Sequence, residues 1–392
     1  ELDYWIDMRN YIRNTLGSHA LQMGSQLNCI TTGISMQFDI VDTHAYHVTP
    51  EFPTGVWDVN NCYVKNIDLA RQKNLNVLTN VAQFRVFEKP FSVSEFDHSY
   101  PNQFASEMYP MLVSYASYQD WDALYTFNFE LIKADESQNT KIIDFFDQTH
   151  NPIKAAASPI AAQIFRKEIF PPESKNFYKI SLNDQKERSI LHKFTIWHIG
   201  MVDAYEKYDL AKALVSKTGI VWEGKYNQVT KTSTPYRFYH DANVGTYVYS
   251  NDNAFIFIGN KNSAKEETSD FSFQILGEFA SIMGLKLNNN RWIFFSGSWS
   301  GNYWENLFEY ATDAPFAKNL NVCVRREINL FAVYPRDTGD TITLSGSGRI
   351  TSKKGQMKIS LLSSEGNVKS TTSATQFDFT ETSGTLWYLV EW

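Results

Sequence analysis

The feature that most constrains this chain is a change of pattern near residue 219. Residues 1 to about 150 alternate apolar strand-like runs with amphipathic helical runs, an order typical of a parallel α/β sheet. From Gly219 to Trp392, short runs rich in β-branched and aromatic residues are separated by Gly, Asn, Asp and Ser. Such short strands with polar turns are typical of a β-sandwich. The sequence therefore predicts an α/β part followed by an all-β part.

The α/β part has elements of recognisable type. A helix is expected over 2–16, because apolar side chains recur at helical spacing and Gly17 follows the last of them. A second helix, with Phe104, Met108, Met111, Leu112 and Tyr115 on one face, is expected after Tyr100. An Ala-rich helix between prolines is expected over 151–172. Strand-like runs occupy 19–28, 38–47, 90–98 and 123–131.

Four strand–loop units in about 130 residues correspond to half of an eightfold barrel, which needs about 250 residues. We therefore expect the second half of a (β/α)8 TIM-type barrel, strands five to eight, over 1–165. Segments 181–194 and 204–215 are expected to be helical, so 166–218 is interpreted as a helical linker region. A β-sandwich accessory domain is expected over 219–392.

Composition excludes several classes of function. The net charge is −7 and no Lys/Arg cluster stands out, so no nucleic-acid partner is expected. No apolar run approaches the roughly 18 residues of a membrane span. Three scattered cysteines predict neither a disulfide framework nor a metal ribbon. Aromatic residues reach 15%, which fits either large cores with many strands or sugar binding by flat rings.

Glu95 is the strongest candidate for a catalytic residue. An apolar strand through Phe91 and Val93 delivers it near the strand's carboxyl end, where catalytic groups sit in parallel barrels. A carboxylate there can attack an anomeric carbon and form a covalent glycosyl intermediate. The alternative is a strand-end Glu that caps a helix or pairs with a Lys.

Segments 38–53, 89–130 and 151–170 together resemble the second half of the barrel in clan-A retaining glycoside hydrolases. The nearest likeness is to the polysaccharide-degrading and β-galactosidase-like members. In these, strand six ends in a D-x-H-x-Y segment, strand seven ends in the nucleophile, and strand eight follows a Q-D-W-D turn. The resemblance covers roughly the first 170 residues, and the β-rich remainder resembles the accessory sandwich domains that follow such barrels.

The resemblance assigns roles to individual positions. Glu95 matches the nucleophile, His44 and Tyr46 match strand-six residues that orient it or touch the sugar, and Gln26 lies at the end of strand five. A Tyr or His that donates a hydrogen bond to the Glu95 carboxylate would favour its ionised form.

Other side chains are candidates for substrate binding, each with ordinary packing as the alternative. Trp57 is a candidate for stacking against a sugar ring of the substrate. His98 and Asn102 are candidates to hydrogen-bond a substrate hydroxyl. A cluster of Trp299, Tyr303 and Trp304 is either a carbohydrate-binding face or part of the sandwich core.

The second carboxyl group of a retaining mechanism has no candidate in this sequence. It should lie about 5–5.5 Å from the nucleophile, and the clan supplies it as an Asn-Glu pair at the end of strand four. No such pair precedes Glu95 on a strand end, and the chain starts at Glu1 without a Met or a signal sequence. We therefore expect the first half of the barrel on another chain or in a longer protein, or closure by dimerisation.

Two histidines, His44 and His47, follow Asp42 at a spacing compatible with a metal site. Residues three apart on a strand face opposite sides, so neither a metal nor a cofactor is expected. The resemblance implies a retaining glycoside hydrolase that acts on a poly- or oligosaccharide and is secreted or periplasmic. The alternative is a non-catalytic carbohydrate-binding or scaffold protein that retains a barrel remnant.

Overall fold

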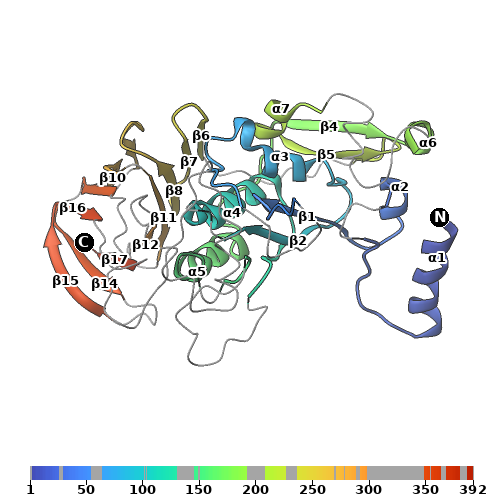
Figure 1. The fold of residues 1–392 in the computed structure, drawn as a ribbon, viewed down its shortest axis with the longest axis horizontal. Helices are drawn as coiled ribbons and strands as arrows, with labels where there is room; N and C mark the ends of the chain where they lie inside the picture. The colour runs from blue at the N-terminus through green and yellow to red at the C-terminus, as the bar shows by residue number, and fades with distance from the viewer. Residues whose placement is uncertain are drawn as a thin grey trace.

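The fold combines helices, parallel strands and antiparallel sheets, arranged in layers along the longest axis (Figure 1). The antiparallel strands lie at one end, the central helices and parallel strands follow, and the N-terminal helix lies at the other end. The computed structural model describes residues 2–25, 30–53, 64–100, 102, 104–129, 145–148, 151–191, 208–226, 236–268, 271–277, 279–287, 292–297, 348–353, 355–362, 368–379 and 386–391.

The helix expected over 2–16 is confirmed. Helix α1 (Leu2–Asn10) continues into a π-helical turn, η1 (Tyr11–Thr15). Gly17 then adopts a φ of +66°, a left-handed conformation that glycine reaches without steric penalty. A short helix α2 (Thr32–Ser35) follows, and the Thr31 hydroxyl accepts the hydrogen bond that caps its first turn.

A parallel sheet carries the candidate site. Its strands β1 (Val41–His47), β2 (Phe91–His98) and β3 (Ala123–Leu124) pair in the order β1-β2-β3. The strands expected over 38–47 and 90–98 are confirmed. Of the strand expected over 123–131, the described residues 123–129 contain only the two-residue strand β3. The run over 19–28 contributes one isolated parallel bridge, from Met23 to Ile40, and residues 26–29 lie outside the described part. No TIM barrel is recognisable among the described residues.

Helices accompany the parallel strands. Helix α3 (Asn76–Ala82) follows the short 3₁₀ helix η2 (Lys73–Leu75). Helix α4 (Met108–Gln119) follows the short 3₁₀ helix η3 (Ala105–Glu107). Helix α5 (Pro152–Arg166) starts as the sequence predicts, with proline in its first turn and the Asn151 side chain accepting from two backbone N–H groups.

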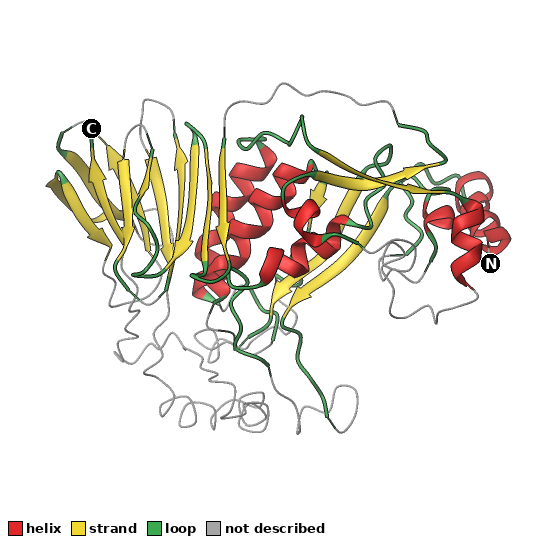
Figure 2. Cartoon of the chain, turned by 90° about the horizontal axis from the view of Figure 1, so that it is seen from above, coloured by secondary structure: helices red, strands yellow, loops and turns green. Residues whose placement is uncertain are grey.

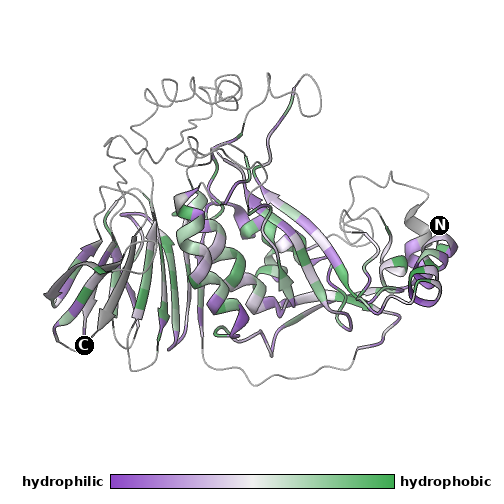
Figure 3. Ribbon diagram, turned by 90° about the horizontal axis from the view of Figure 1, so that it is seen from below, coloured by the Kyte–Doolittle hydropathy of each residue, from purple (hydrophilic) through white to green (hydrophobic). Residues whose placement is uncertain are grey.

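Helix α4 differs from the one-sided amphipathic helix that was expected, because every one of its residues is buried. Seen from above, the central helices stand between the antiparallel and the parallel strands (Figure 2). The contact is specific: the Ser114 hydroxyl of α4 lies 2.7 Å from the Tyr247 hydroxyl of the antiparallel sheet. Green, hydrophobic stretches line the strands and helices of this region (Figure 3). A helix covered on both sides has no solvent face.

The region expected to be a helical linker contains strands as well as helices. Strand β4 (Phe177–Leu182) is followed by α6 (Asp184–Leu191), α7 (Leu210–Leu214) and β5 (Lys217–Trp222). Strand β4 forms because Ile180 and Leu182 alternate with exposed residues and point into the core. Strand β5 pairs in parallel with β4 and bridges Val86, so the antiparallel part begins after it.

The antiparallel strands that the structure describes form two sheets. Strands β15-β14-β17-β12-β11-β8-β7-β6 form one and β16-β13-β10-β9 the other. Phe255 of β8 and Phe273 of β10 stack with ring centroids 4.1 Å apart, so the sheets share an apolar layer. The strand bounds are β6 (Arg237–Asp241), β7 (Thr246–Ser250), β8 (Ala254–Gly259), β9 (Glu266–Glu267), β10 (Phe271–Ile275), β11 (Ala280–Lys286), β12 (Trp292–Gly297), β13 (Gly348–Ser352), β14 (Met357–Leu362), β15 (Val368–Ala374), β16 (Gln376–Phe379) and β17 (Leu386–Glu391).

Candidate functional site

A one-residue irregularity between β1 and β2 shapes the site. Thr43 pairs with Val93, but the next residue of β1, His44, pairs with Glu95, so Ser94 is an extra residue in β2. Consecutive residues of a regular strand face opposite sides, and a bulge changes that direction locally. Ser94 and Glu95 therefore both reach His44. Its Nε2 lies 2.8 Å from the Ser94 hydroxyl, and its Nδ1 lies 3.1 Å from Oε2 of Glu95.

Glu95 is held by two side chains of β1. The Tyr46 hydroxyl donates a hydrogen bond to Oε2 of Glu95, the same oxygen that His44 approaches. The His44 Nδ1 contact is close without the alignment of a full hydrogen bond. The Glu95 side chain keeps 29% of its surface exposed, so a ligand can reach the carboxylate.

Tyr46 stays protonated because of its surroundings. Its ring packs against Phe127 and Phe146, with centroids 6.3 and 5.2 Å away. Burial raises the pKa of the Tyr46 phenol far above its ordinary value, and the hydrogen bond to Glu95 adds to the rise. The phenol is therefore a permanent donor to the carboxylate.

A second carboxylate, Asp42, lies beneath this pair. Its side chain has no exposed surface, and its two oxygens accept hydrogen bonds from Ser92 and, at 2.5 Å, from Ser94. Burial raises the pKa of Asp42, and the two serine hydroxyls oppose that rise. Burial also lowers the pKa of His44, against the opposing attraction of Glu95 and Asp42.

Polar groups also fill the core next to Tyr46. Lys154 of α5 lies 2.5 Å from Oδ1 of Asp97, and their side chains are only 1% and 2% exposed. The rings of His47 and His98 lie 4.6 Å apart. Burial lowers the pKa of His47 to about 4, although its Nε2 bonds the Ile67 carbonyl at 2.9 Å. Burial also holds the pKa of His98 well below its usual range, with His47 and Lys154 contributing.

Two of the residues expected to contact substrate are buried in the structure. His98 and Asn102 were expected to reach a sugar hydroxyl, but they are 0% and 1% exposed. The Asn102 amide donates to the Ile67 carbonyl at 2.8 Å, and its oxygen accepts from the Phe104 amide at 2.7 Å. Asn102 therefore joins neighbouring loops, and His98 belongs to the core.

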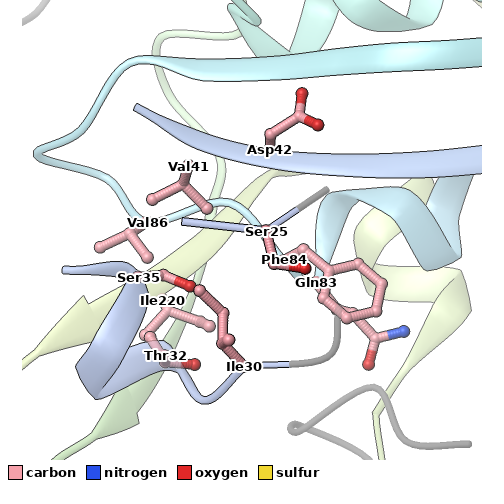
Figure 4. Close-up of a pocket in the computed structure, with 10 residues that line it drawn as sticks. All are labelled: Ser25, Ile30, Thr32, Ser35, Val41, Asp42, Gln83, Phe84, Val86 and Ile220. Carbon is pink, nitrogen blue, oxygen red and sulfur yellow. The ribbon is translucent and has the colours of Figure 1, made fainter. Parts of the chain in front are cut away.

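Two cavities lined by described residues adjoin the site. The larger, of about 450 Å³, borders His44 and Tyr46 and is lined by polar groups that include Asn76, Asn80 and the Glu51–Lys65 ion pair of 2.5 Å. The smaller, of about 20 Å³, is drawn in Figure 4 and has the size for one water. The Asp42 carboxylate points away from this small cavity, toward the neighbouring strand (Figure 4).

Several predicted residues lie outside the described part of the chain: Gln26, Trp57, Trp299, Tyr303 and Trp304. His44 and His47 face different sides of β1, because His44 contacts Ser94 and Glu95 whereas His47 bonds the Ile67 carbonyl. Within the described residues no group of three His, Cys, Asp or Glu side chains is arranged to hold a metal ion.

Comparison with protein-family models, curated proteins and solved structures finds no match to this chain. None of the described helices has the length and apolar character to cross a membrane.

Proposed function

We propose that this chain carries the nucleophile of a retaining glycoside hydrolase, and that the nucleophile is Glu95. The observation that carries the proposal is a partly exposed carboxylate on a parallel strand, held by a tyrosine and a histidine from the adjacent strand. The same three residues match the family pattern in the sequence.

The contacts suggest how the carboxylate would act. Tyr46 and His44 both contact Oε2 of Glu95. Because neither contacts Oε1, we assign the attack on the anomeric carbon to Oε1. As the new C–O bond forms, the bond to the leaving group breaks, and the departing oxygen takes the electron pair and a proton from a general acid. Tyr46 and His44 act as positioning groups that fix the direction of attack.

The general acid belongs to a part of the protein that is not described. Among the described residues, the groups in contact with Glu95 are a phenol and an imidazole rather than a second carboxyl group. In this proposal β1, β2 and β3 correspond to strands six to eight of a (β/α)8 barrel, whose first half lies elsewhere in the protein or on another chain. The two antiparallel sheets correspond to an accessory β-sandwich.

The cavity beside Tyr46 and His44 supports the proposed substrate class. Its volume of about 450 Å³ is within the range of small-ligand sites, and amides and charged groups on its walls suit a substrate rich in hydroxyls. We therefore propose a poly- or oligosaccharide substrate, degraded outside the cytoplasm. No cofactor takes part in the proposed reaction.

The proposal is tested by a hydrolysis screen of the complete protein against plant, microbial and animal glycans. Glu95→Gln should lower the rate on any cleaved glycan by at least about 1,000-fold and leave the circular dichroism spectrum unchanged. The exposed Glu223→Gln is the matched control and should retain full activity. Normal hydrolysis by Glu95→Gln would refute the assignment.

A second candidate function is a non-catalytic carbohydrate-binding or scaffold protein. It is favoured by the lack of a second carboxyl group at Glu95 among the described residues and by the 15% aromatic content. Glycan-array binding without hydrolysis, even by the complete protein, would favour this function over the first.

A further inference from the structure

The cavity beside Tyr46 and His44 has walls of two kinds. Ile67, Val77 and Phe84 contribute apolar surface to this cavity of about 450 Å³, and side chains with amide, carboxylate and ammonium groups line it as well. A pyranose ring is divided in the same way, because C–H groups occupy its two faces and hydroxyl groups project from its edge. The walls therefore suit a sugar ring that lies next to the candidate nucleophile.

Two asparagines of helix α3 bring amide groups to this cavity. Asn76 and Asn80 both line it, and residues four apart lie on the same face of a helix. The Asn76 side-chain oxygen accepts from the Val77 backbone N–H at 2.8 Å, and the Asn80 oxygen accepts from the Gln83 side chain at 3.5 Å. The amino groups of both asparagines have no acceptor among the described residues. Their N–H groups are therefore available to the oxygens of a sugar.

The charged groups of the cavity form an ion pair. Among the described residues that line it, the charged side chains are Glu51 and Lys65, and Nζ of Lys65 lies 2.5 Å from Oε1 of Glu51. These side chains are 38% and 44% exposed, so a ligand can reach both. His44 and His47 also line the cavity, but burial lowers the pKa of each, so both are neutral at neutral pH. The described walls thus carry no net charge.

The wall that carries Lys65 is fixed from behind by buried side chains. The Asn102 amide donates to the carbonyl oxygens of Lys65, at 3.4 Å, and of Ile67, at 2.8 Å. Nε2 of His47 also donates to the Ile67 carbonyl, at 2.9 Å. Asn102 and His47 are only 1% and 5% exposed. A wall that is held in place before a ligand arrives loses less conformational freedom on binding.

We propose that this cavity binds an uncharged sugar ring of the glycan, and that the Glu51–Lys65 pair sets this specificity. The inference rests on the proposed function for the identity of the ligand as a glycan. The Lys65 ammonium donates to one sugar oxygen, and the Glu51 carboxylate accepts from the neighbouring hydroxyl. A donor and an acceptor side by side match two neighbouring hydroxyl groups, each of which both donates and accepts.

The same pair disfavours charged sugars. The carboxylate of a uronic acid can approach Lys65 only beside the carboxylate of Glu51, which lies 2.5 Å from the ammonium. The ammonium of an amino sugar can approach Glu51 only beside Lys65. Like charges are thus brought together in either case, which is a common means of rejecting a wrong ligand. Because both side chains are partly exposed, solvent limits the effect to about 5- to 10-fold in Kd.

Binding of matched glycan pairs tests the specificity. The complete protein carries Glu95→Gln, so that a bound glycan is not cleaved. The probes are arrayed oligosaccharides of glucose, galactose and mannose, each beside a counterpart whose C6 hydroxyl groups have been oxidised to carboxylates. In every pair that binds, the neutral member should bind about 5- to 10-fold more tightly than the oxidised one. A pair whose oxidised member binds equally or more tightly, or a lack of binding to every neutral glycan, overturns the proposal.

Charge variants in the same Glu95→Gln background test whether the ion pair is responsible. Glu51→Gln removes the negative charge beside Lys65, so the oxidised member of a pair should then bind more tightly than the neutral one. That gain should shrink as salt is added, because the pair is partly exposed. Lys65→Gln should instead strengthen the rejection of oxidised glycans. The matched control Glu223→Gln, which removes the carboxylate of an exposed pair with Lys225 outside the cavity, should leave the preference unchanged. An unchanged preference in Glu51→Gln overturns the proposal.

This inference and the proposed function can fail separately. The array measures binding, whereas the nucleophile is judged by cleavage in protein that retains Glu95. A preference for neutral glycans that reverses in Glu51→Gln, without cleavage of any glycan, keeps the inference and refutes the nucleophile. Cleavage that depends on Glu95, with no effect of Glu51→Gln on glycan preference, keeps the nucleophile and refutes the inference.

Discussion

His44 faces Glu95 across the parallel strand pair, with Nδ1 and Oε2 3.1 Å apart, and this pairing depends on one extra residue in β2. Without the bulge at Ser94, the register that joins Asp42 to Ser92 would continue unchanged, and His44 would stand opposite Ser94. The bulge thus lets one imidazole contact a serine through one nitrogen and the candidate nucleophile through the other.

Removing the Tyr46 hydroxyl should weaken catalysis without unfolding the protein. Tyr46→Phe keeps the ring contacts with Phe127 and Phe146 and deletes the donor to Glu95. A hydrogen bond to a charged group is worth about 1.5–3 kcal/mol, so kcat/KM should fall roughly 10- to 150-fold. The exposed Tyr4→Phe is the control, and an equal loss in both variants would contradict a specific role for Tyr46.

Breaking the buried Asp97–Lys154 pair should destabilise the fold strongly. Lys154→Met leaves the Asp97 carboxylate in the core without its ammonium partner, which should cost about 3–5 kcal/mol in the free energy of unfolding. The double variant Asp97→Asn, Lys154→Met should recover much of that loss. Lys225→Met, which breaks the exposed pair with Glu223, should cost less than about 1 kcal/mol. Denaturant titration measures all three, and similar losses for Lys154→Met and Lys225→Met would refute the prediction.

His47 should make the protein sensitive to acid. Its pKa is about 4 in the folded protein, below the ordinary value of 6.5, so the unfolded chain takes up the proton first as the pH falls. The stabilisation is present above about pH 6.5 and is lost toward pH 4, by about 2–3 kcal/mol for this one group.

His47→Gln should flatten this part of the stability–pH curve, because glutamine still donates to the Ile67 carbonyl but does not titrate. Unfolding free energies at pH 7 and pH 4.5 measure the effect. His19→Gln, at an exposed position, should leave the curve unchanged. An unaltered curve in His47→Gln would show that another group causes the acid sensitivity.

Local patterns predicted the elements that hold the site. Alternating apolar residues through Phe91 and Val93 identified β2, and the D-x-H-x-Y pattern led to His44 and Tyr46, which the structure places against Glu95. These elements are predictable because side-chain direction along a strand follows a fixed period.

The parts that sequence reasoning missed depend on contacts between distant segments. The bulge at Ser94 has no glycine to mark it, so the role of the two serines at Asp42 emerges only from the pairing with β1. His98 looked like a binding residue because it follows Glu95 closely, yet packing from other segments buries it completely. Helix α4 is buried on every side because an antiparallel sheet covers the face that faces solvent in an ordinary amphipathic helix.

The most direct test of the central claim is covalent trapping of Glu95. A panel of 2-deoxy-2-fluoro glycosides with dinitrophenolate leaving groups suits this purpose, because such leaving groups depart without help from a general acid. The account predicts that at least one sugar of the panel adds its glycosyl mass to the protein, that peptide mapping places the adduct on Glu95, and that Glu95→Gln stays unmodified. A glycosyl adduct on another residue, formed equally in Glu95→Gln, would contradict the account.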